Sequence, residues 1–394
     1  MNAPPSPPGA ERADSSAVQI GALVPLTRPG WVEAGQHLLA GLELAVREVN
    51  DTGGIAGRPL ELVVRDTAAD PQRATAAVDE LARLGVAALA GEYHSLVARD
   101  AATRADSLGL PFLCSSAVLD ALTERPTEWV ARLAPAQSRG WQVYADFLLS
   151  AGHSRIAVAA EPSVYWASGA RILRDYFSPR GGTVIELGVR ALAPAAVCDE
   201  LAGNGATALL LLVGYPEPAV SLVRSVRRDQ RLAEIMIGAP AGQPEFAGWA
   251  ALLGDDGVAI PFLRYRPERL SPLGARVETA LRQRLAEVPS FVAFEGYDTV
   301  VVLADLLRSH GADRARIAES WPRVAVEGTR GQIRFSRTPG ISVWQWSWPP
   351  IQVADRDPAE PGRFRILASR PARAGLTGTP DSTRGETSRG ESSR

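Results

Sequence analysis

The stretch from Gly41 to Asp66 constrains the fold of this chain more than any other. Its first part carries apolar residues at the spacing of one helix face, namely Leu42, Ala45, Val46 and Val49. The glycines of Asn50-Asp-Thr-Gly-Gly54 can adopt the positive φ that ends a helix. An apolar strand at 60–66 follows, and another precedes the helix at 18–25. Strand, helix and strand in this order form the repeating unit of a parallel sheet.

The same alternation continues along the chain in two series. Further apolar strands are expected at 86–90 and 110–114, and a second series at 156–160, 183–187, 208–214 and 234–238. At 394 residues the chain exceeds one ordinary core. The sequence therefore predicts an α/β protein with two lobes.

Specific residues give this pattern a family resemblance. A strand that ends in Pro25-Leu-Thr27 is followed by Gly35, by the helix around Ala45 and by Gly53-Gly-Ile-Ala-Gly-Arg58. This arrangement closely resembles the leucine/isoleucine/valine-binding branch of the type I periplasmic binding proteins, over about residues 18–350. The resemblance implies two Rossmann-like lobes with parallel central sheets, joined by a three-strand hinge that closes around a ligand.

The resemblance also implies how the chain divides. The first lobe is expected to comprise 18–133 and 264–332, and the second lobe 134–263 and 333–368, with crossings near 130–135, 257–262 and 331–335. The end segments 1–17 and 369–394 lack apolar periodicity and are predicted to be disordered.

One strand in the second lobe carries an unusual aromatic pattern. Trp344, Trp346 and Trp348 alternate, which places them on one face of a strand at 341–348. We expect this stripe to belong to the core or to an interface rather than to a binding site.

Motifs for catalysis, metals and cofactors are missing from the sequence. The four histidines are scattered, and no Gly-x-Ser-x-Gly motif occurs. The chain contains no lysine, which excludes a P-loop. Cys114 and Cys198 are far apart and are not expected to form a disulfide or a metal site. We therefore expect no enzyme activity, no catalytic residues, no metal and no cofactor.

The ligand site follows from the resemblance. Gly91 to Ser95 matches a Gly-x-x-x-Ser loop whose serine binds the ligand carboxylate in the family. A second loop, which supplies backbone groups and a threonine hydroxyl, corresponds to 111–118 and has Val118 in place of the threonine. Two tyrosines of the family also have counterparts, and a tryptophan in the first loop is a candidate wall of the cleft. The residues expected at the ligand are Trp31, Ser95, Ser115, Ser116, Ala117, Val118, Tyr165 and Tyr215.

The sequence departs from the family at the position of an acid. The glutamate that pairs with a ligand ammonium would fall in Gly238-Ala-Pro-Ala-Gly242, where no acid is present. A buried ammonium without a carboxylate costs several kcal/mol. An amide, a urea-like compound or an organic or aromatic acid therefore fits at least as well as an amino acid. Glu92, Glu161 or Asp298 could still supply an acid from another direction.

Each assignment has a purely structural alternative. Ser95 and the pair Ser115-Ser116 could cap helices, and Tyr165 and Tyr215 could be core or rim residues with satisfied hydroxyls. If these residues instead bind the ligand, their side chains should meet at the carboxyl ends of the strands.

The expected function is reversible binding of a small polar solute by the substrate-binding component of a branched-chain-amino-acid-type ABC transporter, with an ABC permease as partner. The alternative is a cytoplasmic regulator of the same fold that senses an amide or amino acid and acts on a regulatory partner protein. The net charge of -2 gives no reason to expect nucleic acid, and no stretch of ~20 apolar residues could insert into a membrane. Because 1–17 has neither the apolar core of a signal peptide nor a cysteine for a lipid anchor, the chain as written is expected to be cytoplasmic. A mis-assigned start codon would make it extracytoplasmic.

Overall fold

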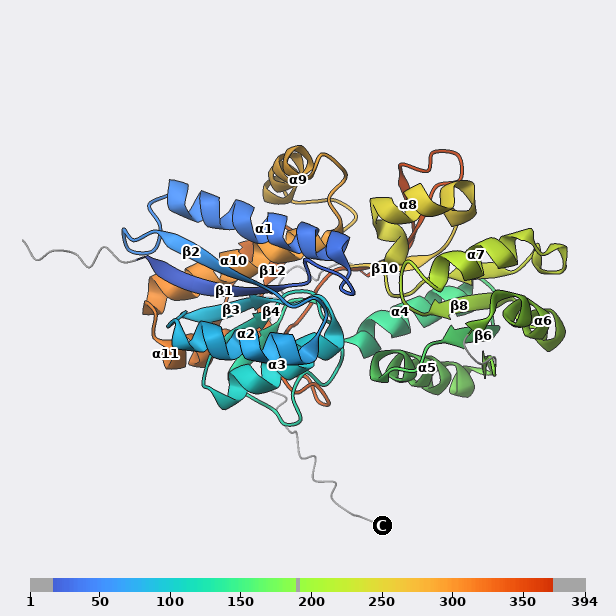
Figure 1. Ribbon diagram of the computed structural model, residues 1–394, viewed down its shortest axis with the longest axis horizontal. Coiled ribbons are helices and arrows are strands. Elements are labelled where there is room, and N and C mark those ends of the chain that lie inside the picture. The colour runs from blue at the N-terminus through green and yellow to red at the C-terminus, as the bar shows by residue number, and fades with distance from the viewer. Residues whose placement is uncertain (1–16, 189–191, 371–394) are drawn as a thin grey trace, which may run out of the picture.

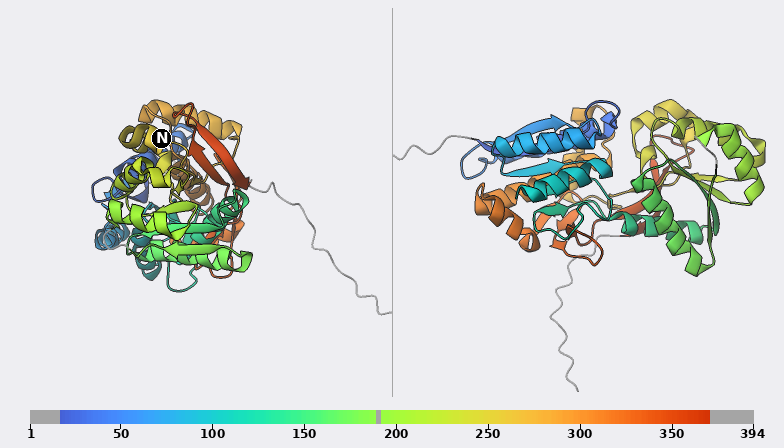
Figure 2. Two further views of the ribbon diagram at one scale, coloured as in Figure 1. Left: turned by 90° about the vertical axis from the view of Figure 1, so that its right-hand side faces the viewer. Right: turned by 60° about the horizontal axis from the view of Figure 1, so that its bottom comes forward.

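Two α/β lobes lie side by side in the computed structural model, which describes residues 17–188 and 192–370 (Figure 1). A view from another direction shows the same division, with a narrower region between the lobes (Figure 2). The predicted two-lobe fold with parallel sheets is confirmed.

The first lobe is built on a seven-stranded sheet. Its parallel part has the order β14-β5-β4-β3-β1-β2, and β13 pairs antiparallel with β14. Ile20 in β1, which lies between β2 and β3, is opposite Leu62 on one side and Ala88 on the other. The strands are β1 (Val18–Val24), β2 (Leu60–Asp66), β3 (Ala88–Gly91), β4 (Phe112–Cys114) and β5 (Val130–Arg132), extended at one edge by β14 (Trp344–Trp346) and β13 (Phe335–Ser336).

Two long helices of this lobe touch through glycine. A Cβ atom on Gly41 would lie 1.9 Å from the carbonyl oxygen of Ala293, and one on Gly296 would lie 2.3 Å from that of Leu38. The helices α1 and α10 therefore meet at backbone contact, and Figure 1 shows them beside each other. The helices of the lobe are α1 (Val32–Asp51), α2 (Pro71–Arg83), α3 (Ser95–Ser107), α9 (Pro272–Leu285), α10 (Phe291–His310) and α11 (Arg314–Glu319).

The second lobe has a four-stranded parallel sheet of order β7-β6-β8-β9. Its strands are β6 (Arg155–Ala160), β7 (Thr183–Glu186), β8 (Ala208–Leu212) and β9 (Met236–Gly238). Every residue of β8 is buried, as its continuous apolar run predicts. The helices are α4 (Gln137–Ser150), α5 (Val164–Phe177), α6 (Pro194–Asn204), α7 (Ala219–Arg228) and α8 (Ala247–Leu253).

The third passage between the lobes differs from the predicted one. The hairpin β11 (Val326–Gly328) and β12 (Gly331–Ile333) is followed by β13 and β14, and β14 pairs with β5 of the first sheet. The chain leaves this lobe only after β14, to form β15 (Ile351–Arg356), which pairs with β10 (Phe262–Arg264) and β16 (Phe364–Arg370). The crossing placed at 331–335 and the assignment of 335–346 to the second lobe are therefore wrong.

Side-chain contacts explain where β14 lies. Gln345 accepts a hydrogen bond from Nε of Arg132 (2.7 Å) and donates to the carbonyl oxygen of Ala134 (2.6 Å). Trp346 is buried beneath the guanidinium of Arg330, whereas Trp348 is 46% exposed beyond the end of the strand. The three tryptophans thus do not form one buried stripe.

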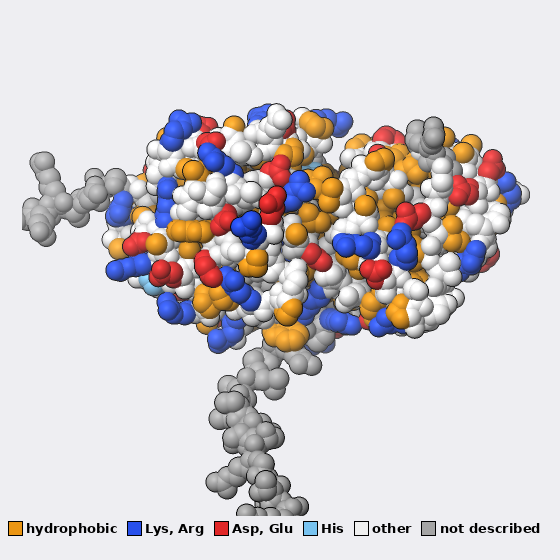
Figure 3. All heavy atoms as spheres, turned by 90° about the horizontal axis from the view of Figure 1, so that it is seen from below, with side chains coloured by type: hydrophobic (Ala, Val, Ile, Leu, Met, Phe, Trp, Pro, Cys, Tyr) orange, Lys and Arg blue, Asp and Glu red, His pale blue; other side chains and the backbone are white. Residues whose placement is uncertain are grey.

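The predicted tail begins too early, because Ser369 and Arg370 belong to β16. The rest of the predicted disorder, at 1–16 and 371–394, lies outside the described residues. Among the helices of the described chain, none is long and apolar enough to cross a membrane. Seen from below, basic and acidic side chains are interspersed over both lobes (Figure 3).

Candidate functional site

A cavity of about 350 Å³ lies between the lobes, at the carboxyl ends of strands from both parallel sheets. The first lobe contributes the loops after β1, β2, β3 and β4, and the second lobe those after β6, β8 and β9. This is where ligands bind in open α/β sheets. Six of the predicted residues line the cavity together: Trp31, Ser95, Ser116, Val118, Tyr165 and Tyr215.

The other two predicted residues lie behind the cavity wall. The Ser115 hydroxyl is buried, accepts a hydrogen bond from the N–H of Gly91 (3.1 Å) and pairs with Oγ1 of Thr299 (2.8 Å). Ala117 is also buried, and its N–H donates to the carbonyl oxygen of Glu92. Both residues support the loop after β4 from inside the lobe.

Ser95 joins two cavity loops. Its Oγ accepts hydrogen bonds from the N–H groups of Val118 (3.2 Å) and Leu119 (3.3 Å), and it makes no cap on α3. Because these bonds use the lone pairs, the hydroxyl hydrogen is left to donate elsewhere. The N–H groups of residues 116–119 all bond within the chain, so this loop presents side chains to the cavity.

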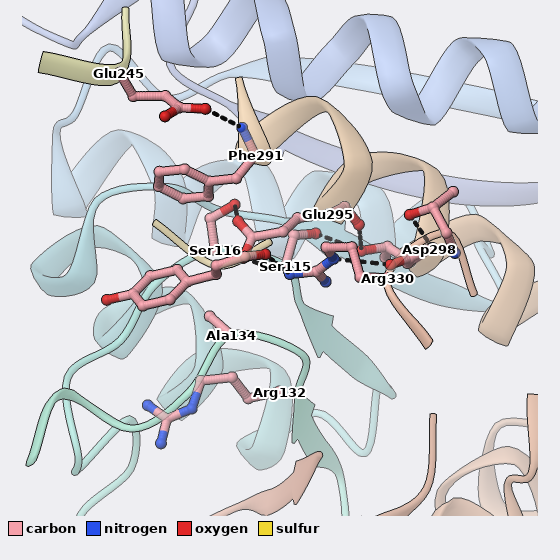
Figure 4. A network of polar contacts seen from close by, with 12 residues as sticks. Ser115, Ser116, Arg132, Ala134, Glu245, Phe291, Glu295, Asp298 and Arg330 are labelled. Atoms are coloured by element: carbon pink, nitrogen blue, oxygen red, sulfur yellow. Dashed lines mark hydrogen bonds and ion pairs between the residues drawn. The ribbon is translucent and has the colours of Figure 1, made fainter. Parts of the chain in front are cut away.

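Ser116 connects the cavity to a fully buried ionic network (Figure 4). Its Oγ lies 2.5 Å from Oε2 of Glu295. The other oxygen of Glu295 accepts from Nη1 of Arg330 (3.1 Å), and Nε of Arg330 donates to Asp298 (2.9 Å). All three charged side chains have no exposed surface. Burial raises the pKa of Glu295 to about 7, against the opposing effect of Arg330.

Aromatic rings from both lobes meet around Trp31. Its ring centroid lies 4.9 Å from that of Tyr215, 4.6 Å from that of Phe246 and 5.6 Å from that of Tyr93. Tyr215 and Phe246 belong to the second lobe, so these contacts cross the cleft. Close by, Oε1 of Glu33 in α1 accepts a hydrogen bond from the N–H of Gly248 in α8 (3.0 Å).

The ionisable side chains in the cavity wall are neutral near pH 7. Nε2 of His94 accepts a hydrogen bond from the N–H of Trp31 (3.0 Å), which places the imidazole hydrogen on Nδ1. Burial lowers the pKa of His94 to about 4. It raises the pKa of the wall tyrosines above the ordinary phenol value, and these are Tyr93, Tyr165, Tyr215 and Tyr265.

Gln243 is a wall residue that the sequence analysis missed. It follows directly after the loop in which an acid was sought, and its side chain is buried at 2% exposure. Nε2 donates to the carbonyl oxygen of Val213 (3.2 Å), while Oε1 has no partner within the described residues. Tyr93 and His94 were missed as wall residues although they lie within the predicted Gly91–Ser95 loop, and Tyr265 and Phe291 were also missed.

The three acids considered as substitutes are occupied elsewhere. Glu92 accepts hydrogen bonds from the N–H groups of Tyr93 and His94, and Glu161 accepts from that of Gly214 (2.5 Å). Asp298 is held by Arg330. Over 17–188 and 192–370, no aspartate, glutamate or arginine lines the cavity. The site can therefore offer hydrogen bonds and aromatic surface, but no direct counter-charge to an ammonium.

Known proteins resemble this chain in sequence and in fold. The family model described as periplasmic binding protein matches residues 17–342. The Leu/Ile/Val-binding protein homolog 8 of Brucella abortus is 30% identical over 178 residues, which span 43% of this chain and 44% of that relative. The match thus covers less than half of the relative's length.

Two solved structures share the fold. A leucine-binding protein from Thermotoga maritima has a TM-score of 0.78 and 19% identity, covering 90% of this chain and 99% of the other. A solute-binding protein of an ABC transporter from R. palustris, solved in complex with benzoate, has a TM-score of 0.75 and 18% identity, covering 92% and 98%.

Proposed function

Because this chain belongs to the periplasmic binding protein family, we propose that it reversibly binds a small aromatic carboxylate or amide between its lobes. Closure around the ligand would present the protein to an ABC permease, as the solute-binding component of a transporter. No covalent step is part of this function.

The observation that carries the proposal is the composition of the cavity wall. Trp31, Tyr93, Tyr165, Tyr215 and Phe291 supply flat apolar surface on several sides of about 350 Å³. Such rings favour stacked or edge-on contact with an aromatic ligand. No carboxylate in the described part of the wall is available for an ammonium, so an α-amino acid would bury its positive charge unpaired.

The polar groups suit one carboxylate or amide at the end of a ring. The hydroxyl of Ser95 and Nδ1–H of His94 are donors, and Oε1 of Gln243 is an acceptor without a partner among the described residues. Leaving a buried acceptor unpaired costs about 1–3 kcal/mol, so a ligand donor at Gln243 would recover part of that cost. The R. palustris protein that shares this fold holds benzoate, which is a ligand of this class.

A binding screen tests the proposal. We expect benzoate or benzamide at saturating concentration to raise the melting temperature through linkage to the folded state, and leucine to leave it unchanged. Trp31→Ala should weaken benzamide binding at least about tenfold, because a buried ring contact with its hydrophobic area is lost. Trp348→Ala removes a tryptophan outside the cavity wall and serves as the matched control. A strong shift with leucine, and none with either aromatic compound, would contradict the proposal.

Delivery to a permease requires the protein to act outside the cytoplasm. Fractionation of cells that express the gene with its native upstream region measures this directly. We expect the protein in the extracytoplasmic fraction. Recovery of the intact protein in the cytosol would instead favour the amide-sensing regulator.

A further inference from the structure

We propose that Glu295 sets the direction of hydrogen bonding at Ser116 and so acts as a positioning residue for ligand specificity. With Glu295 ionised, Ser116 would present an acceptor to the cleft and favour an amide N–H. With Glu295 protonated, Ser116 would present a donor and favour a carboxylate. This inference rests on the proposed function and deepens it.

The argument starts from the single hydrogen of the Ser116 hydroxyl. Ser116 lines the cavity, and its Oγ is 2.5 Å from Oε2 of Glu295. An ionised carboxylate only accepts hydrogen bonds, so the hydroxyl hydrogen must then point at Glu295. The lone pairs of Oγ are left for the cleft. A protonated Glu295 can donate to Oγ instead, which frees the hydroxyl hydrogen for a ligand.

The surroundings of Glu295 make both states accessible. One guanidinium, that of Arg330, serves two buried carboxylates, those of Glu295 and Asp298. With both ionised, the network carries a net charge of -1 without exposed surface, and one proton neutralises it. Tyr93 and Tyr265 also interact electrostatically with Glu295, and burial keeps both in the neutral phenol form. Burial raises the pKa of Glu295 to about 7, so Glu295 gains or loses its proton within a pH range in which binding can be measured.

Other titrating groups near the cavity can be separated from this effect. The pKa of His94 lies at about 4 and those of the wall tyrosines lie above 10, so neither changes state between about pH 6 and pH 8.5. Glu92 does titrate nearby, with its pKa raised to about 8 by burial. Its carboxylate accepts hydrogen bonds from Thr67 and from backbone N–H groups, and within the described part of the chain no hydrogen bond joins it to the Ser116 hydroxyl.

Benzoate and benzamide form a matched pair of probes, because they share the ring and differ in the polarity of one group. Calorimetric titration of both at about pH 6 and pH 8.5 measures the ratio of their dissociation constants. We expect the dissociation constant of benzoate, divided by that of benzamide, to rise at least about tenfold between these two pH values. One pH unit above a pKa lowers the protonated fraction of the group about tenfold. Benzoate itself stays ionised throughout this range.

Two variants and one control make the test specific. Glu295→Gln removes the titration and Ser116→Ala removes the hydroxyl that transmits it, so either should hold the ratio constant within about twofold. Thr299→Val, one helical turn from Glu295, removes a buried hydroxyl but keeps the Ser116–Glu295 contact, and should retain the pH dependence. Ser116→Ala leaves the ionic network intact if Glu295→Gln does not fold.

The outcomes separate this inference from the proposed function. If both probes bind but their ratio is independent of pH, the inference is overturned and the proposed function stands. A pH dependence that persists in Glu295→Gln would assign the effect to Glu92 and also overturn it. If neither probe binds the wild-type protein, the proposed function falls, and the inference falls with it.

Discussion

Replacing Arg330 with methionine would leave two buried carboxylates without their shared cation. Arg330 donates to Glu295 (3.1 Å), to Asp298 (2.9 Å) and to the carbonyl oxygen of Tyr265 (3.2 Å). Asp298 in turn accepts from the backbone and hydroxyl of Thr329, at the turn between β11 and β12. The substitution keeps similar side-chain volume and removes all of the charge.

Arg330→Met should lower the free energy of unfolding strongly, and the size of this decrease should depend on pH. Removing one partner of a buried ion pair costs about 3–5 kcal/mol, because the remaining charge stays desolvated. Without the guanidinium, the pKa values of Glu295 and Asp298 rise further above their ordinary range. The folded state then holds more protons than the unfolded state, so stability falls as pH rises. We expect the free energy of unfolding of Arg330→Met to lie about 3–5 kcal/mol below that of the wild-type protein at pH 8, with a clearly smaller difference at pH 5.

Urea unfolding followed by tryptophan fluorescence, at both pH values, measures the free energy of unfolding from the midpoint and slope. Arg174→Met is the matched control, because Arg174 and Glu186 form an exposed pair for which about 0–1 kcal/mol is expected. A loss below about 1 kcal/mol at pH 8, or an equal loss at both pH values, would refute the reasoning about buried charge.

Three further substitutions test other parts of the structure. Gly41→Val should destabilise the protein by at least about 1–3 kcal/mol in urea unfolding, since its Cβ would overlap α10, whereas Gly203→Ala on the open side of α6 should cost nothing. In the wild-type protein, the raised pKa of Glu295 should add up to about 3 kcal/mol to the free energy of unfolding below about pH 4.5, and this stabilisation is lost as the pH rises through about 7. Glu295→Gln should remove this pH-dependent stabilisation. Melting temperatures across this range check it, and a constant difference between the two proteins would contradict it. Gln243→Leu should weaken benzamide binding about fivefold to tenfold in calorimetry, by loss of an amide acceptor, and an unchanged affinity would exclude that contact.

Local sequence carried enough information for the fold but not for every strand partner. Buried positions can be identified from the sequence because burial selects apolar residues. Examples are the helical spacing of Leu42, Ala45 and Val49 and the continuous apolar run of β8. The alternation at 344–346 correctly indicates a strand, but its pairing with β5 depends on Gln345 meeting Arg132, a contact between residues 213 positions apart. No local pattern encodes such a contact.

The site was predictable where a loop follows a strand and less so elsewhere. Ser95, Ser116 and Tyr215 were predicted from the family resemblance, and the converging ends of the parallel strands bring their loops together at the cavity. Glu295 was missed because it is one of many residues buried in α10, and its importance comes from one neighbour across the lobe. Whether the residues lining the cavity contact a ligand stays a prediction.

The contacts of Trp31 and Glu33 across the cleft affect how much free energy a ligand must supply to hold the two lobes together. The tilted contacts of the Trp31 ring with Tyr215 and Phe246, and the hydrogen bond from Gly248 to Glu33, hold the two lobes together without any contribution from the ligand. The apparent affinity of a binding protein is its intrinsic affinity scaled by the fraction of molecules already competent to bind. These contacts therefore raise the apparent affinity by the same factor for every solute that the cavity admits, and discrimination between solutes depends on the aromatic and polar groups that line the cavity.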